Sequence, residues 1–487
     1  MSERKWPECI LYPLISYIEE NKALFTDVSD KIWEYAELSL KEYKSADLYC
    51  EVLKKEGFQV EYPFAGIETA FKGTFGSGKP VIGILAEYDA LSGLSQEAGV
   101  ASRKELIPNG SGHGCGHNLL GAGSLAAAFA VKKYLENNPG KGTVHFYGCP
   151  GEEGGASKAF MARDGVWKEL DIALTWHPSD VNQVGSGTCN SCIQTEYHFK
   201  GIASHAAGDP ELGRSALDAV ELMNIGVQFL REHMPDTARI HYAITDAGGV
   251  SPNVVQPHAK VLYMVRSILA KDALLLQERV DKIAQGAAMM TETKVESVFI
   301  DGCSNTVPNR ILEELCDAKF NEIGVPSFTE EEMAFAKELV DSYEMENDAL
   351  PGMYLNDYSE LEELVKEHSE NGTKPLNDFY IPYRYSNKPM MGSTDVGDVS
   401  WLVPTMQFYT ACVPSKAPGH SWQNVSCGKT SIAHKGMLHA GKIMTLMAID
   451  LYENPELIEK AWDEFRQAAK SGYYCPVPVD AILKPIE

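Results

Sequence analysis

Three short strand-like segments constrain the fold more than any other feature of this sequence. They span residues 80–86, 142–147 and 171–176, and the first is a continuous apolar run. Such a run is typical of a strand that is buried on both faces, and the other two segments are interpreted as further buried strands. The segments between them include 119–135, which is rich in Ala and Leu and predicts a helix. This alternation predicts an α/β fold of the zinc-peptidase type, with a mostly parallel central sheet.

The predicted order of helices and strands changes between about Cys189 and Cys303. In this part of the chain, the order of strand, helix, strand, strand, helix and strand predicts a ferredoxin-like α+β domain. A chain of 487 residues is also too long for one core of ordinary size. We therefore expect a catalytic domain from residues 1–190 and 305–487, and a lid or dimerisation domain from residues 191–304.

Charge and cysteine content exclude several classes of protein. The chain has 43 Lys and Arg against 68 Asp and Glu, a formal net charge of −25. Nucleic acid and anionic membranes are therefore not expected as partners, because binding phosphates requires clustered cations. The sequence contains no apparent signal peptide or membrane span, and its eleven cysteines lack a disulfide-like spacing, so we expect a cytoplasmic protein. The acidic segment 330–368 is interpreted as a solvated insertion without chemistry.

Two loops carry residues that could bind a metal ion. Cys115 and His117 lie in a Gly-rich loop before a predicted helix, and both residue types are good ligands for zinc-like ions. Glu152 and Glu153 follow a predicted buried strand, where one carboxylate could bind metal while its neighbour moves protons. Taken singly, the first could be an ordinary glycine-rich turn and the second a solvated pair of glutamates.

Two further histidines complete a possible metal centre. His177 ends a predicted strand and His420 lies in a Gly-containing loop, although each alone could be a hydrogen-bonded structural histidine. Together the candidates exceed the three protein ligands of one tetrahedral catalytic site, and they suit two metals about 3.5–4 Å apart. The candidate ligands are Cys115, His117, Glu153, His177 and His420.

The order of these motifs resembles metallopeptidase family M20, in its amidohydrolase branch (subfamily D). The branch's His-x-Cys-Gly-His-Asp motif reads 113–118 here, with Asn118 in place of Asp, and its Glu-Glu-Gly-Gly reads 152–155. Its Ala-Asp-Met-Asp-Ala-Leu motif reads 86–91. The segments 392–401 and 418–423 are most similar to the B-type chains of aminobenzoyl-glutamate hydrolases.

The resemblance implies a dinuclear site with two divalent metal ions per subunit, Mn²⁺ or Zn²⁺. Cys115 would be shared between the ions, and Glu152 would be the general base. Asp89 would support the site from behind the ligands. Glu87 stands where many relatives in the wider family have a metal-binding His, and whether it touches metal is left open.

The resemblance also implies roles for three residues of the predicted lid. His205 would stabilise the oxyanion in the site of a partner subunit. Asn253 and Arg266 would hold a substrate carboxylate, since the planar Arg fork binds carboxylates bidentately. The ordinary alternatives are a surface His, a turn Asn and an exposed strand Arg. The implied assembly is a homodimer or a pairing with a related A-type chain.

The function implied is metal-dependent hydrolysis of the amide bond of an N-acyl amino acid. The candidate substrate is p-aminobenzoyl-glutamate, which would yield p-aminobenzoate and glutamate. One alternative is a dipeptidase, or an aminoacylase or auxin-conjugate hydrolase of the same family. A non-enzymatic alternative is a regulatory subunit with a vestigial metal site.

Overall fold

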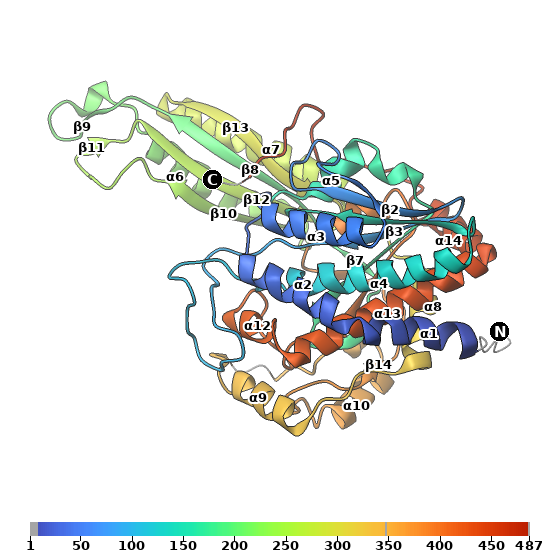
Figure 1. Cartoon of the computed structure of the whole chain (residues 1–487). Helices are drawn as coiled ribbons and strands as arrows, with labels where there is room; N and C mark the ends of the chain where they lie inside the picture. Colours follow the sequence, from blue (N-terminus) through green and yellow to red (C-terminus); the bar gives the residue numbers. More distant parts are fainter. Residues whose placement is uncertain (1–7, 346–347, 486–487) are drawn as a thin grey trace. The chain divides into compact units, whose positions relative to one another are not determined.

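The computed structural model describes residues 8–345 and 348–485, which form two compact units (Figure 1). The first unit comprises residues 1–187, 307–388 and 399–472, and the second comprises residues 188–306, 389–398 and 473–487. The assignment of residues 191–304 as a lid or dimerisation domain stays a prediction.

An eight-stranded mixed sheet organises the first unit. Its strand order is β1-β2-β4-β3-β5-β16-β6-β14, and the four neighbours β4, β3, β5 and β16 run parallel. The predicted mostly parallel α/β sheet is thus confirmed at its centre, where the three predicted buried strands lie. The strands are β1 Gln59–Glu61, β2 Phe71–Ser77, β3 Val81–Ala86, β4 Gly142–Gly148, β5 Ile172–Ser179, β6 Asn182–Val184, β14 Tyr380–Ile381 and β16 Thr405–Ala411.

Helices pack against this sheet and bury a large apolar core. Helices α4 and α13 contact each other, and α1 and α2 contact both (Figure 1). A β-carbon on Gly123 of α4 would lie 2.9 Å from the Met437 carbonyl of α13, so the close approach requires glycine. The helices are α1 Glu8–Glu20, α2 Lys22–Tyr35, α3 Tyr43–Lys55, α4 His117–Asn137, α5 Ser157–Arg163, α8 Arg310–Ile323, α9 Glu330–Val340, α10 Ser359–His368, α11 Val396–Ser400, α12 Trp422–Cys427, α13 Ser431–Glu453 and α14 Pro455–Ala468.

The second unit contains a four-stranded antiparallel sheet in the order β10-β12-β8-β13. Helices α6 and α7 share a buried core with it. Numbered along the chain, its strands follow the ferredoxin-like order, so this part of the predicted fold is confirmed. The elements are β7 Thr188–Cys189, β8 Ser191–Lys200, β9 Ser204–His205, α6 Ala216–Arg231, β10 Arg239–Asp246, β11 Val254–Val255, β12 His258–Ser267, α7 Ala270–Thr291, β13 Lys294–Cys303 and β15 Pro389–Met390.

The acidic insertion contains helices α9 and α10, with the 3-10 helix Leu355–Asp357 between them. The N-terminus of α9 is closed by a capping box between Thr329 and Glu332. Ala336 and Leu339 of α9 are buried beside Cys427 of α12, so this part of the insertion packs against the first unit's core. Across the described chain, no helix has the length and apolar character needed to cross a bilayer.

Candidate metal centre

The parallel strands of the first unit place the chemically active residues at one edge of the sheet. Glu87 follows β3, Glu153 follows β4, and His420 lies in the loop after β16. His177 was expected to end its strand, but β5 continues two residues beyond it. Carboxyl ends of parallel strands meet at the same sheet edge, which is where open α/β sheets bind ligands.

The five predicted ligands form two overlapping groups. The ligand atoms of Cys115, His117 and His177 lie within 4.8 Å of one another, as do those of Cys115, Glu153 and His420. Cys115 is the member common to both groups. The structure therefore brings all five side chains together, with the thiol between a bis-histidine side and a Glu–His side. That they bind metal stays a prediction.

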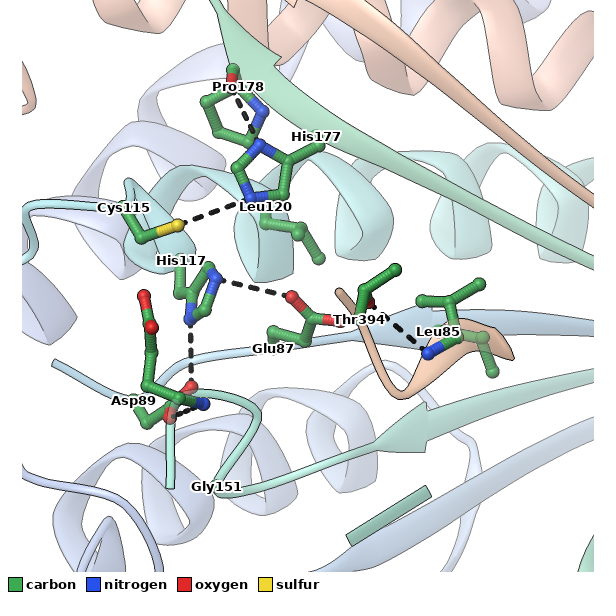
Figure 2. Close-up of polar contacts among 12 residues, drawn as sticks. Leu85, Glu87, Asp89, Cys115, His117, Leu120, Gly151, His177, Pro178 and Thr394 are labelled. Atoms are coloured by element: carbon green, nitrogen blue, oxygen red, sulfur yellow. Dashed lines mark hydrogen bonds and ion pairs between the residues drawn. The ribbon is translucent and has the colours of Figure 1, made fainter. Parts of the chain in front are cut away.

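Two of the histidines are held through Nδ1, with Nε2 turned toward the other candidate ligands or Glu87 (Figure 2). Nδ1 of His117 lies 2.8 Å from Asp89 Oδ1, and Nδ1 of His177 lies 2.7 Å from the Pro178 carbonyl oxygen. A carbonyl and an ionised carboxylate only accept, so each Nδ1 carries the hydrogen and donates. Cys115 and Asp89 outweigh burial and raise the pKa of His117, so its ring is charged until a cation binds. A bound cation would replace the Nε2 hydrogen of His117, and Nε2 of His177 lies 3.3 Å from Cys115 Sγ. Donation from Nδ1 is the usual support of a metal-binding imidazole.

The residues present fit a pair of divalent ions. Among the described residues, buried His117 Nε2 and Glu153 Oε1 have no hydrogen-bond partner of good geometry. His420 Nε2 lies 3.2 Å from that Glu153 oxygen. Buried polar atoms are rarely left in this condition, and atoms that converge on one point suit a ligand. A thiol, imidazoles and a carboxylate are the donors that Zn²⁺ and related ions accept.

The pKa shifts in the site follow from burial and from neighbouring charges. Burial raises the pKa of the Cys115 thiol, and it lowers the pKa of His177 together with the charge of His117. Burial opposes ionisation of Asp89 as well, but His117 outweighs it and the pKa of Asp89 falls. A bound cation would favour the thiolate and the neutral imidazole, so metal binding would release the thiol proton.

Two loops carrying ligands are fixed by special backbone geometry. Gly116 has φ +82° at the start of α4, a left-handed conformation that glycine adopts without cost. His420 has φ +52° directly before the N-cap of α12, which is unusual for a residue with a side chain. Asn424 of α12 donates to the Gly114 carbonyl at 3.1 Å and so ties the two loops together.

Asn118, the departure from the family motif, points away from the ligands. Its amide Nδ2 donates to Ser29 Oγ at 3.0 Å and to the Gly428 carbonyl at 3.1 Å. An ionised Asp could not donate to that carbonyl. The Asn therefore joins α2, α4 and the end of α12 behind the site.

Sequence reasoning missed two groups beside the ligands. Buried Lys158 of α5 lies with Nζ 2.7 Å from Glu87 Oε1, while Glu87 Oε2 lies 3.3 Å from His117 Nε2. Buried Glu42 accepts the Gly151 N–H at 2.8 Å, and burial together with the Asp89 charge raises the pKa of Glu42 to about 8. For Lys158, the available sequence signal was a lysine shortly after the Glu-Glu pair. For Glu42, the sequence offered no signal.

The three predicted lid residues do not gather at one point of the second unit. The backbone N–H of Ala206, next to His205, donates to the Asn253 carbonyl at 3.0 Å, so His205 and Asn253 are neighbours on the β9–β11 ribbon. Arg266 lies eight residues along β12 from its start at His258, about 26 Å of extended strand. Its Nη1 donates to Ser393 Oγ at 2.6 Å.

Comparison with known proteins places the chain in a family. The sequence model described as peptidase family M20/M25/M40 matches residues 83–434, and the chain belongs to this family. The B chain of the p-aminobenzoyl-glutamate hydrolase of Escherichia coli (strain K12) is 44% identical over 479 residues, which cover 96% of this chain and 98% of that protein. The Xaa-Arg dipeptidase of Mus musculus is 26% identical over 464 residues, covering 92% and 90% of the two chains.

A solved structure shares the fold. A dinuclear metal binding peptidase of family M20 from Bacillus subtilis has a TM-score of 0.54 and 15% sequence identity, covering 89% of this chain and 99% of that one. The predicted resemblance to family M20 and the α/β fold class are thus confirmed.

Proposed function

We propose that the protein is a dinuclear metal-dependent amidohydrolase that cleaves the amide bond of an N-acyl amino acid. The observation that carries this proposal is the sharing of Cys115 between the two ligand groups. One shared donor between two such groups suits a pair of ions, whereas a structural zinc site would be a closed set of four ligands.

The ions would be Mn²⁺ or Zn²⁺. Two such ions would polarise the scissile carbonyl and lower the pKa of an attacking water. His117 and His177 with Cys115 would hold one ion, and Glu153 and His420 with the same Cys115 would hold the other. Asp89 fixes the His117 ring from behind and also accepts the backbone N–H of Glu153 at 2.9 Å, so one carboxylate orients a ligand on each side.

Glu152 is the general base of the proposed reaction. A carboxylate oxygen of Glu152 lies within 4.8 Å of His117 and Glu87 ligand atoms, next to the candidate centre. Glu152 would accept a proton from the attacking water and later deliver it to the leaving amine. The buried Glu42 holds the Gly151 N–H and so fixes the turn that presents Glu152 and Glu153.

The proposed substrate is p-aminobenzoyl-glutamate, a product of folate breakdown. Its support is the relative that covers almost the whole chain and whose name states this activity. Arg266 would bind a substrate carboxylate, for which the acidic chain otherwise offers little positive charge. Dipeptide hydrolysis is the second candidate, favoured by the Xaa-Arg dipeptidase that also matches most of the chain.

The proposed partner is a second copy of this chain, joined through the second unit. Strand β10 is an edge strand of its sheet, with Tyr242 43% and Ile244 44% exposed. Phe229 of α6 is 70% exposed. An unpaired apolar edge is a template for strand pairing, and a two-fold axis closes such a pair. His205 would then act in the partner's site, and Asn253 and Arg266 would hold the substrate carboxylate; a related A-type chain is the other outcome.

Substrate screening on metal-reconstituted protein tests the proposal. The panel consists of p-aminobenzoyl-glutamate, hippurate, N-acetyl amino acids and dipeptides, each with Mn²⁺ and with Zn²⁺. We expect the highest kcat/KM for p-aminobenzoyl-glutamate and complete loss of turnover after chelation. Preference for dipeptides would select the second candidate. Two bound metal equivalents without hydrolysis of any substrate would instead favour a regulatory subunit with a vestigial site.

A further inference from the structure

A fully buried ion pair stands directly behind the candidate metal centre. Lys158 is 0% exposed and Glu87 is 2% exposed, and their Nζ and Oε1 atoms lie 2.7 Å apart. A buried pair of this kind seldom stabilises a fold, because removing two charges from water costs about as much as their attraction returns. Apolar side chains of similar volume would serve packing equally well. The pair therefore calls for a reason other than stability.

The second carboxylate oxygen of Glu87 indicates a functional reason for the buried pair, because this oxygen faces the candidate metal ligand His117. Glu87 Oε2 lies 3.3 Å from His117 Nε2, the nitrogen that would bind a cation. Glu87, His117 and Glu152 also offer ligand atoms within 4.8 Å of one another. Glu87 therefore has one oxygen held by a cationic side chain, and its other oxygen faces His117 (Figure 2).

Lys158 offsets part of the negative charge around the site. The Cys115 thiolate and the carboxylates of four acidic residues would give five negative charges, whereas two divalent ions would give four positive ones. Lys158 adds a positive charge beside these groups. In a buried site an unbalanced charge is costly, and its field acts strongly on nearby ions. The four acidic residues are Glu87, Asp89, Glu152 and Glu153.

We propose that Lys158 is a positioning residue that holds Glu87 beside the metal pair, rather than on it, and that sets the affinity of the site for its ions. This inference rests on the proposed function, because it presumes that the two ligand groups bind divalent cations. Lys158 keeps one Glu87 oxygen turned away from the centre and cancels the charge of that carboxylate. The ions are then bound less tightly than an unpaired carboxylate would hold them.

The test compares three variants of the full-length protein loaded with Mn²⁺ or Zn²⁺. Lys158→Met removes a positive charge beside the ions, so metal loss to a chelator should slow by about tenfold or more. Glu87→Gln removes a negative charge beside the ions, so metal loss should accelerate by about tenfold. The double variant is neutral and similar in volume, and it should release metal within about twofold of the wild-type rate. Metal content by elemental analysis should stay at two ions per chain in all three.

A matched control separates this role from ordinary packing. Lys132 is also nearly buried, pairs with Glu56 and Glu136, and lies about four turns along α4 from His117. Lys132→Met should lower the melting temperature and leave the metal release rate unchanged.

Three outcomes would overturn the proposal. Faster metal loss in Lys158→Met would indicate a packing role, and unchanged rates in both single variants would show that the pair does not act on the ions. A double variant that still loses metal rapidly would show that Glu87 itself binds the cation. A wild-type protein that binds no metal would instead remove the proposed function itself.

Discussion

Two buried carboxyls, one in each unit of this protein, show pKa shifts in opposite directions. In the first unit Asp89 is buried against His117, and the charge of that ring lowers the pKa of Asp89 despite burial. In the second unit Asp398 is equally buried, but its partners are the Tyr473 hydroxyl at 2.7 Å and the Ser304 backbone N–H at 2.9 Å. Burial prevails there and raises the pKa of Asp398 to about 7.

The difference extends to how each unit arranges its candidate functional residues. The parallel strands of the first unit end at one edge, so residues from distant parts of the chain converge within a few ångströms. In the second unit Arg266 lies about 26 Å of strand from the start of β12 at His258, whereas His205 and Asn253 lie on the separate β9–β11 ribbon. The first unit therefore concentrates chemistry, whereas the second offers two separate points of contact.

The sharpest way to break this comparison is to remove the proposed base from the first unit. Glu152→Gln keeps the size of the side chain but removes its ability to accept a proton. We expect kcat to fall by about a thousandfold or more, since general-base catalysis contributes about 10²–10⁴-fold. Metal content should stay at the wild-type value. Normal turnover in a variant that retains its metal would refute the assignment of chemistry to this edge of the sheet.

The next largest effect concerns the buried carboxyl of the second unit. Because the folded pKa of Asp398, about 7, exceeds the usual value, the folded state holds this proton more tightly than the unfolded chain. The protonated Asp398 carboxyl contributes about 4 kcal/mol to the free energy of unfolding below about pH 4. This contribution is lost as the pH rises to about 7. Asp398→Asn should remove this dependence, so the variant's gain in unfolding free energy should grow between pH 5 and 8.

Denaturant unfolding of both proteins across that range checks this prediction. Asp180→Asn is a comparable change at a partly buried carboxyl of the first unit, whose pKa is also raised by burial. A stability difference between the Asp398 variant and wild type that is the same at pH 5 and pH 8 would contradict a proton held at this position.

Much of the fold followed from the sequence because the buried strands are short, apolar and bounded by breakers. The run 80–86 became β3 and the run 142–147 became β4 with shifts of one residue. The ferredoxin-like order was equally readable from alternating strands and two long helices. The small strands β6 and β14 were not predicted individually, because few residues carry their signal and their pairing depends on distant partners.

The candidate site was predictable only where the residue types are themselves typical metal ligands. Cysteine, histidine and adjacent glutamates in Gly-rich loops identified the five ligands, and the structure gathers them. Lys158 and Glu42 were missed because Lys and Glu are ordinarily exposed, and only tertiary contacts show that both are buried here. The separation of Arg266 from Asn253 also depends on strand geometry that motif spacing does not contain.

Mixtures of two inactive variants test the role of the second unit. If His205 acts in the site of a partner copy, His205→Ala should lower kcat about a hundredfold, as expected for the loss of an oxyanion donor. A mixture of His205→Ala with Glu152→Gln should recover part of the activity, because one intact site forms in the mixed dimer. His258→Ala is the matched control, an exposed histidine of the same unit paired with Asp246. A mixture that stays inactive would place His205 outside the partner's site.

The variant with the smallest expected effect tests whether Arg266 binds a carboxylate of the substrate. Nη1 of Arg266 donates to Ser393 Oγ. Arg239 pairs with Arg266 on the adjacent strand β10, and its guanidinium donates to the backbone carbonyls of Asp236 and Ala238. Arg266→Ala should raise KM for an acyl-glutamate about tenfold, the loss of one charge-assisted contact, and raise it much less for an uncharged acyl amide. Arg239→Ala should change neither. An equal rise for both substrates would mean that Arg266 supports the strand rather than the ligand, and the second unit would then contribute to the site only through its β9–β11 ribbon.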